Sequence, residues 1–293
     1  MTGKAMADAK VGVIGGSGLY QMEGMGESVE EVRVRTPFGD PSDAITIGSI
    51  EGTRVAFLPR HGKGHRLSPT EVPVQANIFA LKSLGVEWII SVSAVGSLKE
   101  EIAPLHLVIP DQLIDRTKSR VNSFFGNGIV VHVGFADPFC PVLANVLFDA
   151  ARDVGVVVHR GGTYVVMEGP LFSTRAESNL YRLWGASVIG MTALPEAKLA
   201  REAEICYATL ACATDYDCWH ETEEDVTVEM IIQNLLTNVG HSKGIIRQAV
   251  ETLPAVREGC PCPTALSQAI ITDRTLIPRG VKADLAPLIG KYV

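Results

Sequence analysis

The chain has 293 residues, of which 46% are hydrophobic and 20% charged, and its formal net charge is −7. This length and composition fit a globular protein with a substantial core. The acidic balance and the absence of a Lys/Arg cluster argue against nucleic acid or a membrane surface as partners, and no apolar run reaches the ~20 residues of a spanning helix. Residues 1–10 form a polar tail without the apolar core of a signal peptide, which predicts a cytoplasmic protein.

Strand and helix patterns alternate along the rest of the chain without a long linker or repeat. Strands are expected over residues 11–14, 44–50, 53–58, 88–92, 105–109, 163–167, 188–190 and 206–213. Helices are expected over residues 70–84, 141–154, 173–184, 195–203 and 226–253, the last with a break near Gly240. This alternation predicts a single α/β domain over residues 11–293, with a mixed twisted sheet flanked by helices. From about residue 254 a Pro- and Cys-containing segment is either irregular or reaches a neighbouring subunit.

Two acids follow the apolar run 206–213. Asp215 and Asp217 stand two positions apart, where a buried strand ends. Ligands of open α/β sheets bind at the carboxyl ends of the strands, and two carboxyl groups there could bind the amine and N7 edge of adenine. The alternative is a strand-to-loop transition in which the Asp side chains form local turn hydrogen bonds.

Other polar groups follow other expected strands. Ser17 lies in a glycine-rich loop, where backbone N–H groups can approach an anion. That loop lacks the third glycine of a dinucleotide fingerprint and the Gly-Lys-Ser/Thr of a P-loop, which leaves an anion site or a purely structural turn. The remaining members of this group are Arg60, His61, Ser93, Ala94 and Thr192. If the strands are parallel, these residues meet at one edge as a phosphate site of hydroxyl groups and one guanidinium.

Three further side chains are candidates for contact with a nucleoside. Phe172 could stack on a base, and Met191 could lie under a sugar or base, although both residue types are also common in cores. His132 lies in an apolar stretch, where a single His is more often a core residue. A phosphate site beside an adenine-binding acid pair indicates phosphorolysis of a nucleoside.

The six cysteines include a Cys260-Pro-Cys262 pair in a Pro-rich segment. A metal site would need two further ligands, and none lies nearby in the sequence. We therefore expect no metal, and either free thiols or a disulfide.

The chain resembles the 5′-methylthioadenosine phosphorylases of the trimeric purine nucleoside phosphorylase superfamily over about residues 11–246. The motifs that carry the resemblance are IGGSGLY from Ile14, TPFGDPSDA from Thr36, RHGKGH from Arg60, QANIFALKSLG from Gln75, SAVGSLKEEI from Ser93, DQLIDRT from Asp111, DPFCP from Asp137, EGPLFSTRAES from Glu168, MTALPEAKLA from Met191 and ATDYDCW from Ala213.

The resemblance implies a single α/β domain assembled as a trimer or a hexamer. It also implies that phosphate attacks C1′ of the nucleoside and releases adenine and 5-methylthioribose 1-phosphate, without a metal or an organic cofactor. By position, the residues that match the phosphate site are Ser17, Arg60, His61, Ser93, Ala94 and Thr192, and those that match the nucleoside site are Phe172, Met191, Asp215, Asp217, His132, Val228 and Ile231. His132 matches a residue that reaches across the subunit interface.

In the mechanism that the resemblance implies, Asp215 gives a proton to N7 of the leaving adenine and Asp217 holds the N6 amine. A buried acid beside a second carboxylate keeps its proton more readily, which suits this role. Relatives that act on 6-oxopurines carry Asn in place of Asp215 and Glu in place of Ser173, and this chain has neither. The alternatives are a phosphorylase for inosine and guanosine, a phosphate-independent nucleosidase and a binding protein without activity. Some cleavage of adenosine is also expected, because an apolar pocket rejects a hydroxyl only weakly.

Overall fold

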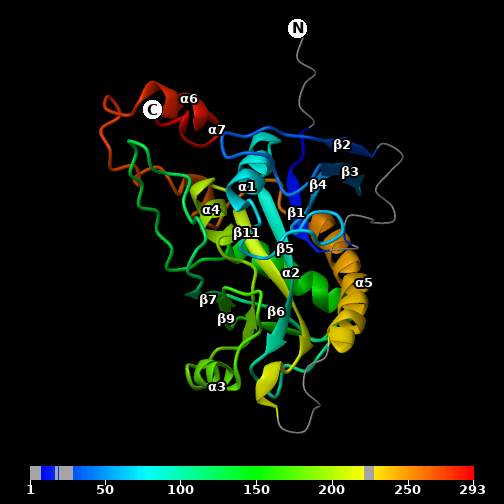
Figure 1. Cartoon of the computed structure of the whole chain (residues 1–293). Helices are drawn as coiled ribbons and strands as arrows, with labels where there is room; N and C mark the ends of the chain where they lie inside the picture. Colours follow the sequence, from blue (N-terminus) through cyan, green and yellow to red (C-terminus); the bar gives the residue numbers. More distant parts are fainter. Residues whose placement is uncertain (1–7, 17–18, 20–28, 221–227) are drawn as a thin grey trace.

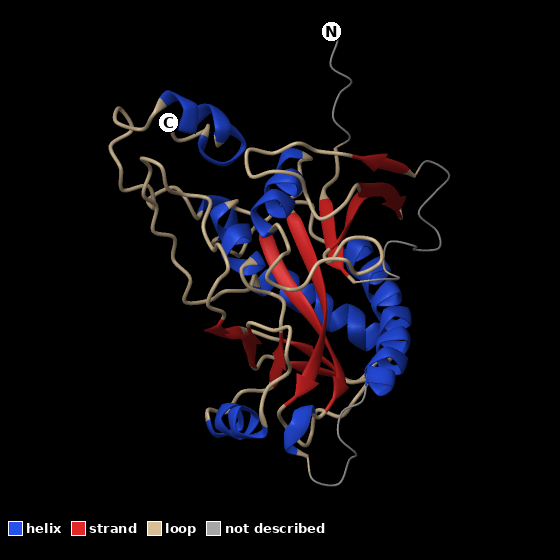
Figure 2. Cartoon of the chain, viewed as in Figure 1, coloured by secondary structure: helices blue, strands red, loops and turns tan. Residues whose placement is uncertain are grey.

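A mixed eleven-stranded sheet lies at the centre of the computed structural model, which describes residues 8–16, 19, 29–220 and 228–293, with the side chains of 228–232 excepted (Figures 1 and 2). The strands are β1 (Val11–Gly15), β2 (Glu30–Val32), β3 (Ile45–Ile50), β4 (Thr53–Pro59), β5 (Trp88–Ser97), β6 (Leu107–Ile109), β7 (Gln112–Arg116), β8 (Val158–Arg160), β9 (Thr163–Met167), β10 (Val188–Gly190) and β11 (Cys206–Asp215). The helices are α1 (Val74–Ser83), α2 (Pro141–Asp153), α3 (Arg175–Leu183), α4 (Glu196–Glu202), α5 (Val228–Thr252), α6 (Arg279–Asp284) and α7 (Ala286–Ile289), with short 3₁₀ turns η1 (Asp217–Trp219) and η2 (Cys262–Thr264).

The sheet branches at β5. β11 runs parallel to β5 along almost its whole length, from Cys206 opposite Trp88 to Asp215 opposite Gly96. On the other edge of β5, β1 pairs in parallel with its first residues and β10 pairs antiparallel with Gly96 and Ser97. No strand among the described residues pairs with the edge of β5 between these two partners, over residues 92–95, which is hereafter called the gap.

Helices cover both faces of the sheet. One apolar cluster joins the sheet to α1, α4 and α7, and a second joins it to α2 and α5 (Figure 1). A smaller third cluster packs Tyr181 of α3 against β9, β10 and Trp219. Both main faces of the central strands are thus buried, which explains why β11 reads as a continuous apolar run instead of an alternating one.

Local sequence explains several element boundaries. β3 and β4 form the expected hairpin, because Glu51 and Gly52 both adopt a positive φ, as a two-residue hairpin turn requires. The helix expected from residue 70 begins only at Val74, after Pro73. Steric contact with a proline ring disfavours helical backbone at the preceding residue, so Val72 cannot belong to the helix.

Other expectations about the elements were wrong in extent. The strand expected over residues 88–92 continues to Ser97 because β11 pairs with it throughout. The expected break in the last long helix is absent from the described backbone, since α5 passes through Gly240 without interruption. The strands β2, β7 and β8 were not expected. β2 and β8 have three residues each, which is too short for the alternation of apolar and polar residues that marks a strand in a sequence.

Residues 8–10 and the segment after α5 both pack against the rest of the described structure. The tail expected over residues 1–10 already contributes Ala9 to the core, with its N–H bonded to the Leu84 carbonyl. At the other end, the segment after α5 folds back on Glu204, whose carboxylate accepts bonds from the Leu266 N–H and the Tyr292 hydroxyl. None of the described helices is both long and apolar enough to cross a bilayer.

Glu202 at the end of α4 gives a test of this packing. Burial raises the pKa of its carboxyl to about 7, despite hydrogen bonds from the Phe124 N–H and the Ser123 hydroxyl. Between the unfolded pKa of 4.5 and this value, the folded chain keeps a proton on Glu202 that the unfolded chain releases. The protonated carboxyl therefore stabilises the fold fully below the unfolded pKa of 4.5, and this stabilisation is lost as the pH rises through 7. We expect Glu202→Gln to remove this loss, which is at most about 3 kcal/mol.

The measurement is the free energy of unfolding of both proteins from about pH 5 to pH 8, where proton linkage is expected to act. His61 is common to both proteins, so its titration cancels in the difference. Glu251→Gln, at an exposed position on α5, is the matched control and should follow the wild-type curve. Parallel curves for wild type and Glu202→Gln would show that Glu202 does not keep its proton on folding.

Candidate functional site

A cavity of about 340 Å³ opens beside the gap in β5. Its walls come from the ends of β1, β4 and β11, from the exposed edge of β5, from the segments after β9 and β10, and from α5. The sequence-predicted residues among its lining are Arg60, His61, Ser93, Ala94, Phe172, Met191, Thr192, Asp215 and Asp217. The structure therefore brings these nine residues together in one region of the sheet, and six of them are polar: Arg60, His61, Ser93, Thr192, Asp215 and Asp217.

The reason for the convergence differs in part from the expected one. β4, β5 and β11 are parallel, as assumed, but β10 runs against β5. Met191 and Thr192 reach the cavity because the antiparallel course of β10, continued past Gly190, leads back along β5 toward Ser93. The Thr192 hydroxyl accordingly donates to Ser93 Oγ at 2.7 Å.

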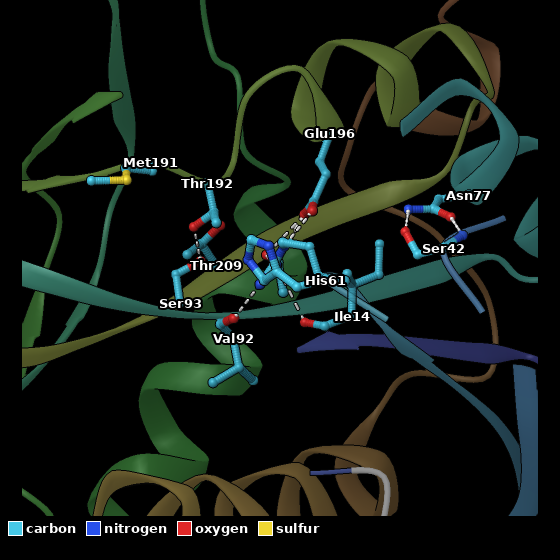
Figure 3. Close-up of polar contacts among 12 residues, drawn as sticks. Ile14, Ser42, His61, Asn77, Val92, Ser93, Met191, Thr192, Glu196 and Thr209 are labelled. Carbon is cyan, nitrogen blue, oxygen red and sulfur yellow. Dashed lines mark hydrogen bonds and ion pairs between the residues drawn. The ribbon is translucent and has the colours of Figure 1, made fainter. Parts of the chain in front are cut away.

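Arg60 is held in a buried ion pair that the sequence did not reveal. Its Nε lies 2.5 Å from Oε1 of Glu196, at the start of α4, and both side chains are about 4% exposed. Nη1 donates to the Val92 carbonyl in the gap of β5, and Nη2 donates to Ser91 Oγ. Figure 3 shows the Glu196 carboxylate and the carbonyl groups of Ile14 and Val92 around this point. The guanidinium has at most one further N–H, on Nη1, for a ligand.

The charges of this pair stabilise each other. Burial opposes the charge on both groups, but the neighbouring Glu196 raises the pKa of Arg60 and the neighbouring Arg60 lowers the pKa of Glu196. Both therefore remain ionised, and their charges cancel at the cavity wall. The guanidinium of the expected phosphate site is thus largely neutralised by a carboxylate that the sequence did not reveal.

His61 presents an acceptor to the cavity instead of the expected donor. Its Nδ1 lies 2.8 Å from the Leu67 carbonyl oxygen, which can only accept, so Nδ1 carries the proton. Burial, with a smaller contribution from the Arg60 charge, lowers the pKa of His61 to about 4. The ring is therefore neutral at pH 7, and Nε2 has a free lone pair that suits a hydroxyl of a bound anion.

Neutral donors supply the rest of the anion site. Backbone groups of alternate residues in a strand point to the same side, so the N–H of Ala94 faces the gap into which the Val92 carbonyl points. Thr214 Oγ1 donates to the Val95 carbonyl on the opposite side of β5, toward β11, which agrees with this alternation. Ala94 is exposed within an otherwise buried stretch. The hydroxyl groups of Ser93 and Thr192 lie beside it (Figure 3).

The two acids lie at the carboxyl end of β11, as predicted. The pairing of β11 with β5 shifts by one residue between Ala213 and Asp215, and such a bulge changes the direction of a side chain. The Asp215 carboxylate accepts from the Asp217 N–H at 2.8 Å and from the Thr214 hydroxyl at 2.6 Å. Burial raises the pKa of Asp217, which favours its protonated form relative to an exposed aspartate.

Ser173 and Gly96 determine the space around the acids. The Ser173 hydroxyl lies 2.9 and 2.8 Å from the two carboxylate oxygens of Asp217. A glutamate at position 173 would place a second carboxylate against this one. A Cβ at Gly96 would stand 3.0 Å from Oδ1 of Asp215, so only glycine leaves that carboxylate in its present position.

Side chains for contact with a base or sugar surround the acids. Phe172 lines the cavity yet is 59% exposed, so it is not a core residue and its ring is accessible to a ligand. The Met191 side chain packs directly against Gly169. A Cβ added at position 169 would lie 2.5 Å from the Met191 sulfur, so the glycine leaves room for it. From α5, Leu235 and Val239 add apolar surface.

The remaining predicted residues are not brought to the cavity by the described part of this chain. His132 is exposed, is absent from the lining, and lies in a segment where its N–H bonds to the Ala269 carbonyl. Ser17 lies outside the described residues, as do the side chains of Val228 and Ile231. The expectations for these last three stay predictions.

Several site residues were missed in the sequence. Glu196 lies in the motif MTALPEAKLA, where a charged residue among apolar neighbours at a helix start was the available signal. Leu235 and Val239 recur at helical spacing on α5, which by itself indicates only a buried face. Two thiols that lie far from the Cys260-Pro-Cys262 pair in the sequence lie next to it in space, namely Cys140 and Cys206.

Comparison with known proteins places this geometry in a class. The model of the phosphorylase superfamily matches residues 10–251, so the chain belongs to that superfamily. Among curated relatives, the S-methyl-5′-thioadenosine phosphorylases of Geobacter sulfurreducens and Chloroflexus aurantiacus are 60% and 59% identical to it, over 97% and 98% of this chain and 99% of each relative.

Solved structures agree with this assignment. A methylthioadenosine phosphorylase from an antarctic soil metagenomic library has a TM-score of 0.92 and 51% identity, covering 96% of this chain and 99% of the other. The methylthioadenosine phosphorylase of Schistosoma mansoni in complex with adenine has a TM-score of 0.80 and 35% identity, covering 97% and 98%. The expected fold, a single mixed α/β domain, is confirmed.

The Arg60–Glu196 pair predicts an unusual response to anions. We expect Glu196→Gln, which keeps the shape but leaves the buried guanidinium uncompensated, to lower the free energy of unfolding by about 3–5 kcal/mol. Added phosphate should restore part of this loss and should raise the melting temperature of the variant more than that of wild type. The exposed pair of Arg54 and Glu30 provides a control: Glu30→Gln should cost less than about 1 kcal/mol. Equal stabilisation of wild type and Glu196→Gln by phosphate would contradict the prediction.

Proposed function

We propose that this protein cleaves 5′-methylthioadenosine with inorganic phosphate, releasing adenine and 5-methylthioribose 1-phosphate. The observation that carries the proposal is the placement of an anion site and an acid pair in one cavity, on adjoining parts of β5 and β11. The names of relatives about 60% identical over nearly the whole chain support the same reaction. Inorganic phosphate is the second substrate, and no organic cofactor or metal is assigned to the reaction.

The phosphate is bound mainly by neutral groups. The Ser93 hydroxyl and the Ala94 N–H donate to its oxygens, and one N–H of Arg60 adds a charged donor. The Thr192 hydroxyl, which donates to Ser93 Oγ in the structure, turns to the anion when it binds. Nε2 of His61 accepts from the hydroxyl of hydrogenphosphate, which orients the other three oxygens toward the donors. Because Glu196 neutralises Arg60, the anion keeps most of its negative charge for the sugar.

That remaining charge assists bond cleavage. As the bond between C1′ and N9 breaks, the sugar gains positive charge, and the adjacent phosphate stabilises it before forming the new C1′–O bond. The electron pair of the broken bond moves onto the purine, which takes a proton at N7. The two acids bind this edge with one proton between them: Asp215 is proposed as the donor to N7 and Asp217 as the partner of the N6 amine.

The 5′ substituent is proposed to lie against the apolar side of the cavity, which includes Leu235 and Val239 of α5. An apolar wall favours a methylthio group over a hydroxyl but rejects the hydroxyl only weakly, so slower cleavage of adenosine remains part of the proposal.

A homotrimer or a hexamer is proposed as the working assembly. His132 is exposed and outside the lining of its own cavity, so a contribution to binding requires a neighbouring subunit. Mixed oligomers of chains that carry His132→Ala and chains that carry Asp215→Asn test this point. A shared site can combine the intact His132 of one subunit with the intact Asp215 of its neighbour, so the mixture should regain activity that neither variant has alone.

The reaction is tested by incubating the protein with methylthioadenosine, adenosine or inosine, each with and without phosphate, and measuring free base. We expect adenine from methylthioadenosine only when phosphate is present, with adenosine slower and inosine slowest. Equal release of adenine without phosphate would identify a nucleosidase, faster release from inosine would identify a 6-oxopurine phosphorylase, and no release would identify a binding protein.

The acid pair is tested by two amide variants. Asp215→Asn should lower kcat/KM for methylthioadenosine roughly 10² to 10⁴-fold, because the amide cannot supply the proton, while inosine should lose less because its 6-oxo group accepts from the amide. Asp217→Asn should chiefly raise KM if this residue only holds the amine. A larger kcat loss in Asp217→Asn than in Asp215→Asn would exchange the two roles.

A further inference from the structure

Four cysteines meet at a point that the proposed reaction does not use. The sulfur atoms of Cys140, Cys206, Cys260 and Cys262 all lie within 4.8 Å of one another, and those of Cys206 and Cys260 are 3.6 Å apart. Cys140, Cys206 and Cys262 are fully buried and Cys260 is partly buried. We propose that these four thiols bind one structural zinc ion.

The distances fit a tetrahedral site. Zinc–thiolate bonds of about 2.3 Å place the four sulfurs of a regular tetrahedron about 3.8 Å apart. The four sulfurs, none more than 4.8 Å from another, therefore need to approach by at most about 1 Å to reach these separations. A disulfide requires sulfurs at about 2.05 Å, so bonding Cys206 to Cys260 would need their sulfurs to approach by about 1.5 Å from their separation of 3.6 Å.

Two features that attract negative charge lie beside the cluster. Cys140 is the N-cap of the 13-residue helix α2, where the first backbone N–H groups and the helix dipole favour negative charge. The guanidinium of Arg201 interacts favourably with Cys262 and also donates to the carbonyls of Gly134 and Asp137, just before Cys140. Zinc replaces the four thiol protons, which pass to solvent, and the positive groups offset the net charge of −2 on the complex.

The position of the site indicates a structural role. Cys206 begins β11 and Asp215 ends it, so the cluster and the acids lie about 30 Å apart along one strand. Four protein ligands leave no position for substrate. The ion would join the start of β11 and the N-terminus of α2 to the segment after α5. That segment packs against residues 129–132 through the β-bridge between Val131 and Ile270. Zinc would therefore also hold residues 129–132 and their partner segment in place.

The first test uses the whole wild-type chain, purified with reductant and dialysed without metal. We expect about one zinc per chain by elemental analysis. Reduced, metal-free protein titrated with Co²⁺ should show thiolate-to-cobalt charge-transfer bands and the visible bands of a tetrahedral site, saturating at one equivalent. Removal of zinc should lower the melting temperature and expose the chain after α5 to limited proteolysis.

A paired variant assigns the ligands. Cys260→Ser combined with Cys262→Ser should lose the zinc and the cobalt bands, whereas Cys218→Ser, a cysteine outside the cluster, should keep both. If the double variant does not fold, the cobalt spectrum of wild type decides the question. Metal-free protein with four reactive thiols and no cobalt bands overturns the proposal, and so does protein that lacks zinc and whose mass shows disulfides among these residues. Neither measurement depends on catalytic activity, so the result is independent of the proposed function.

Discussion

The buried ion pair between Arg60 and Glu196 is the interaction on which the site depends. It connects the end of β4 to α4 across the open edge of β5, where no strand supplies hydrogen bonds. Desolvation of two charges is costly, and the pair is stable because Ser91 and Tyr207 satisfy the carboxylate while backbone carbonyls satisfy the guanidinium. One of these bonds, from Nη1 of Arg60 to the Val92 carbonyl, satisfies part of the open edge of β5.

This arrangement separates two tasks within one cavity. On one side, neutral donors along β5 and after β10 are proposed to bind an anion without removing its charge. On the other side, the bulge in β11 directs Asp215 toward the cavity, and burial raises the pKa of Asp217. A nucleoside bound between them has a negative charge next to its sugar and a proton source next to its base. Both features assist cleavage of the bond that joins sugar and base.

The opposite ends of β11 have different chemistry. Asp215 at one end belongs to the cavity, and Cys206 at the other belongs to the four-thiol cluster. The core strand between them is fully buried and pairs with β5 and β6, so it forms a rigid connection between the two regions. The C-terminal segment is attached to the sheet near the second end, through the thiols and through the hydrogen bonds to Glu204.

The sequence by itself determined the alternation of elements, the β3–β4 hairpin, the acids after β11 and most of the polar groups in the cavity, because each is a local pattern of apolar period, turn residue or charge. Only the tertiary structure decided what those groups do. The charge of Arg60 is cancelled by Glu196, 136 positions away, and His61 becomes an acceptor because a backbone carbonyl occupies its proton. The four cysteines also meet only on folding. Local patterns carry no information about which distant groups share a buried volume, and in a low-dielectric interior those neighbours determine charge, protonation and bonding.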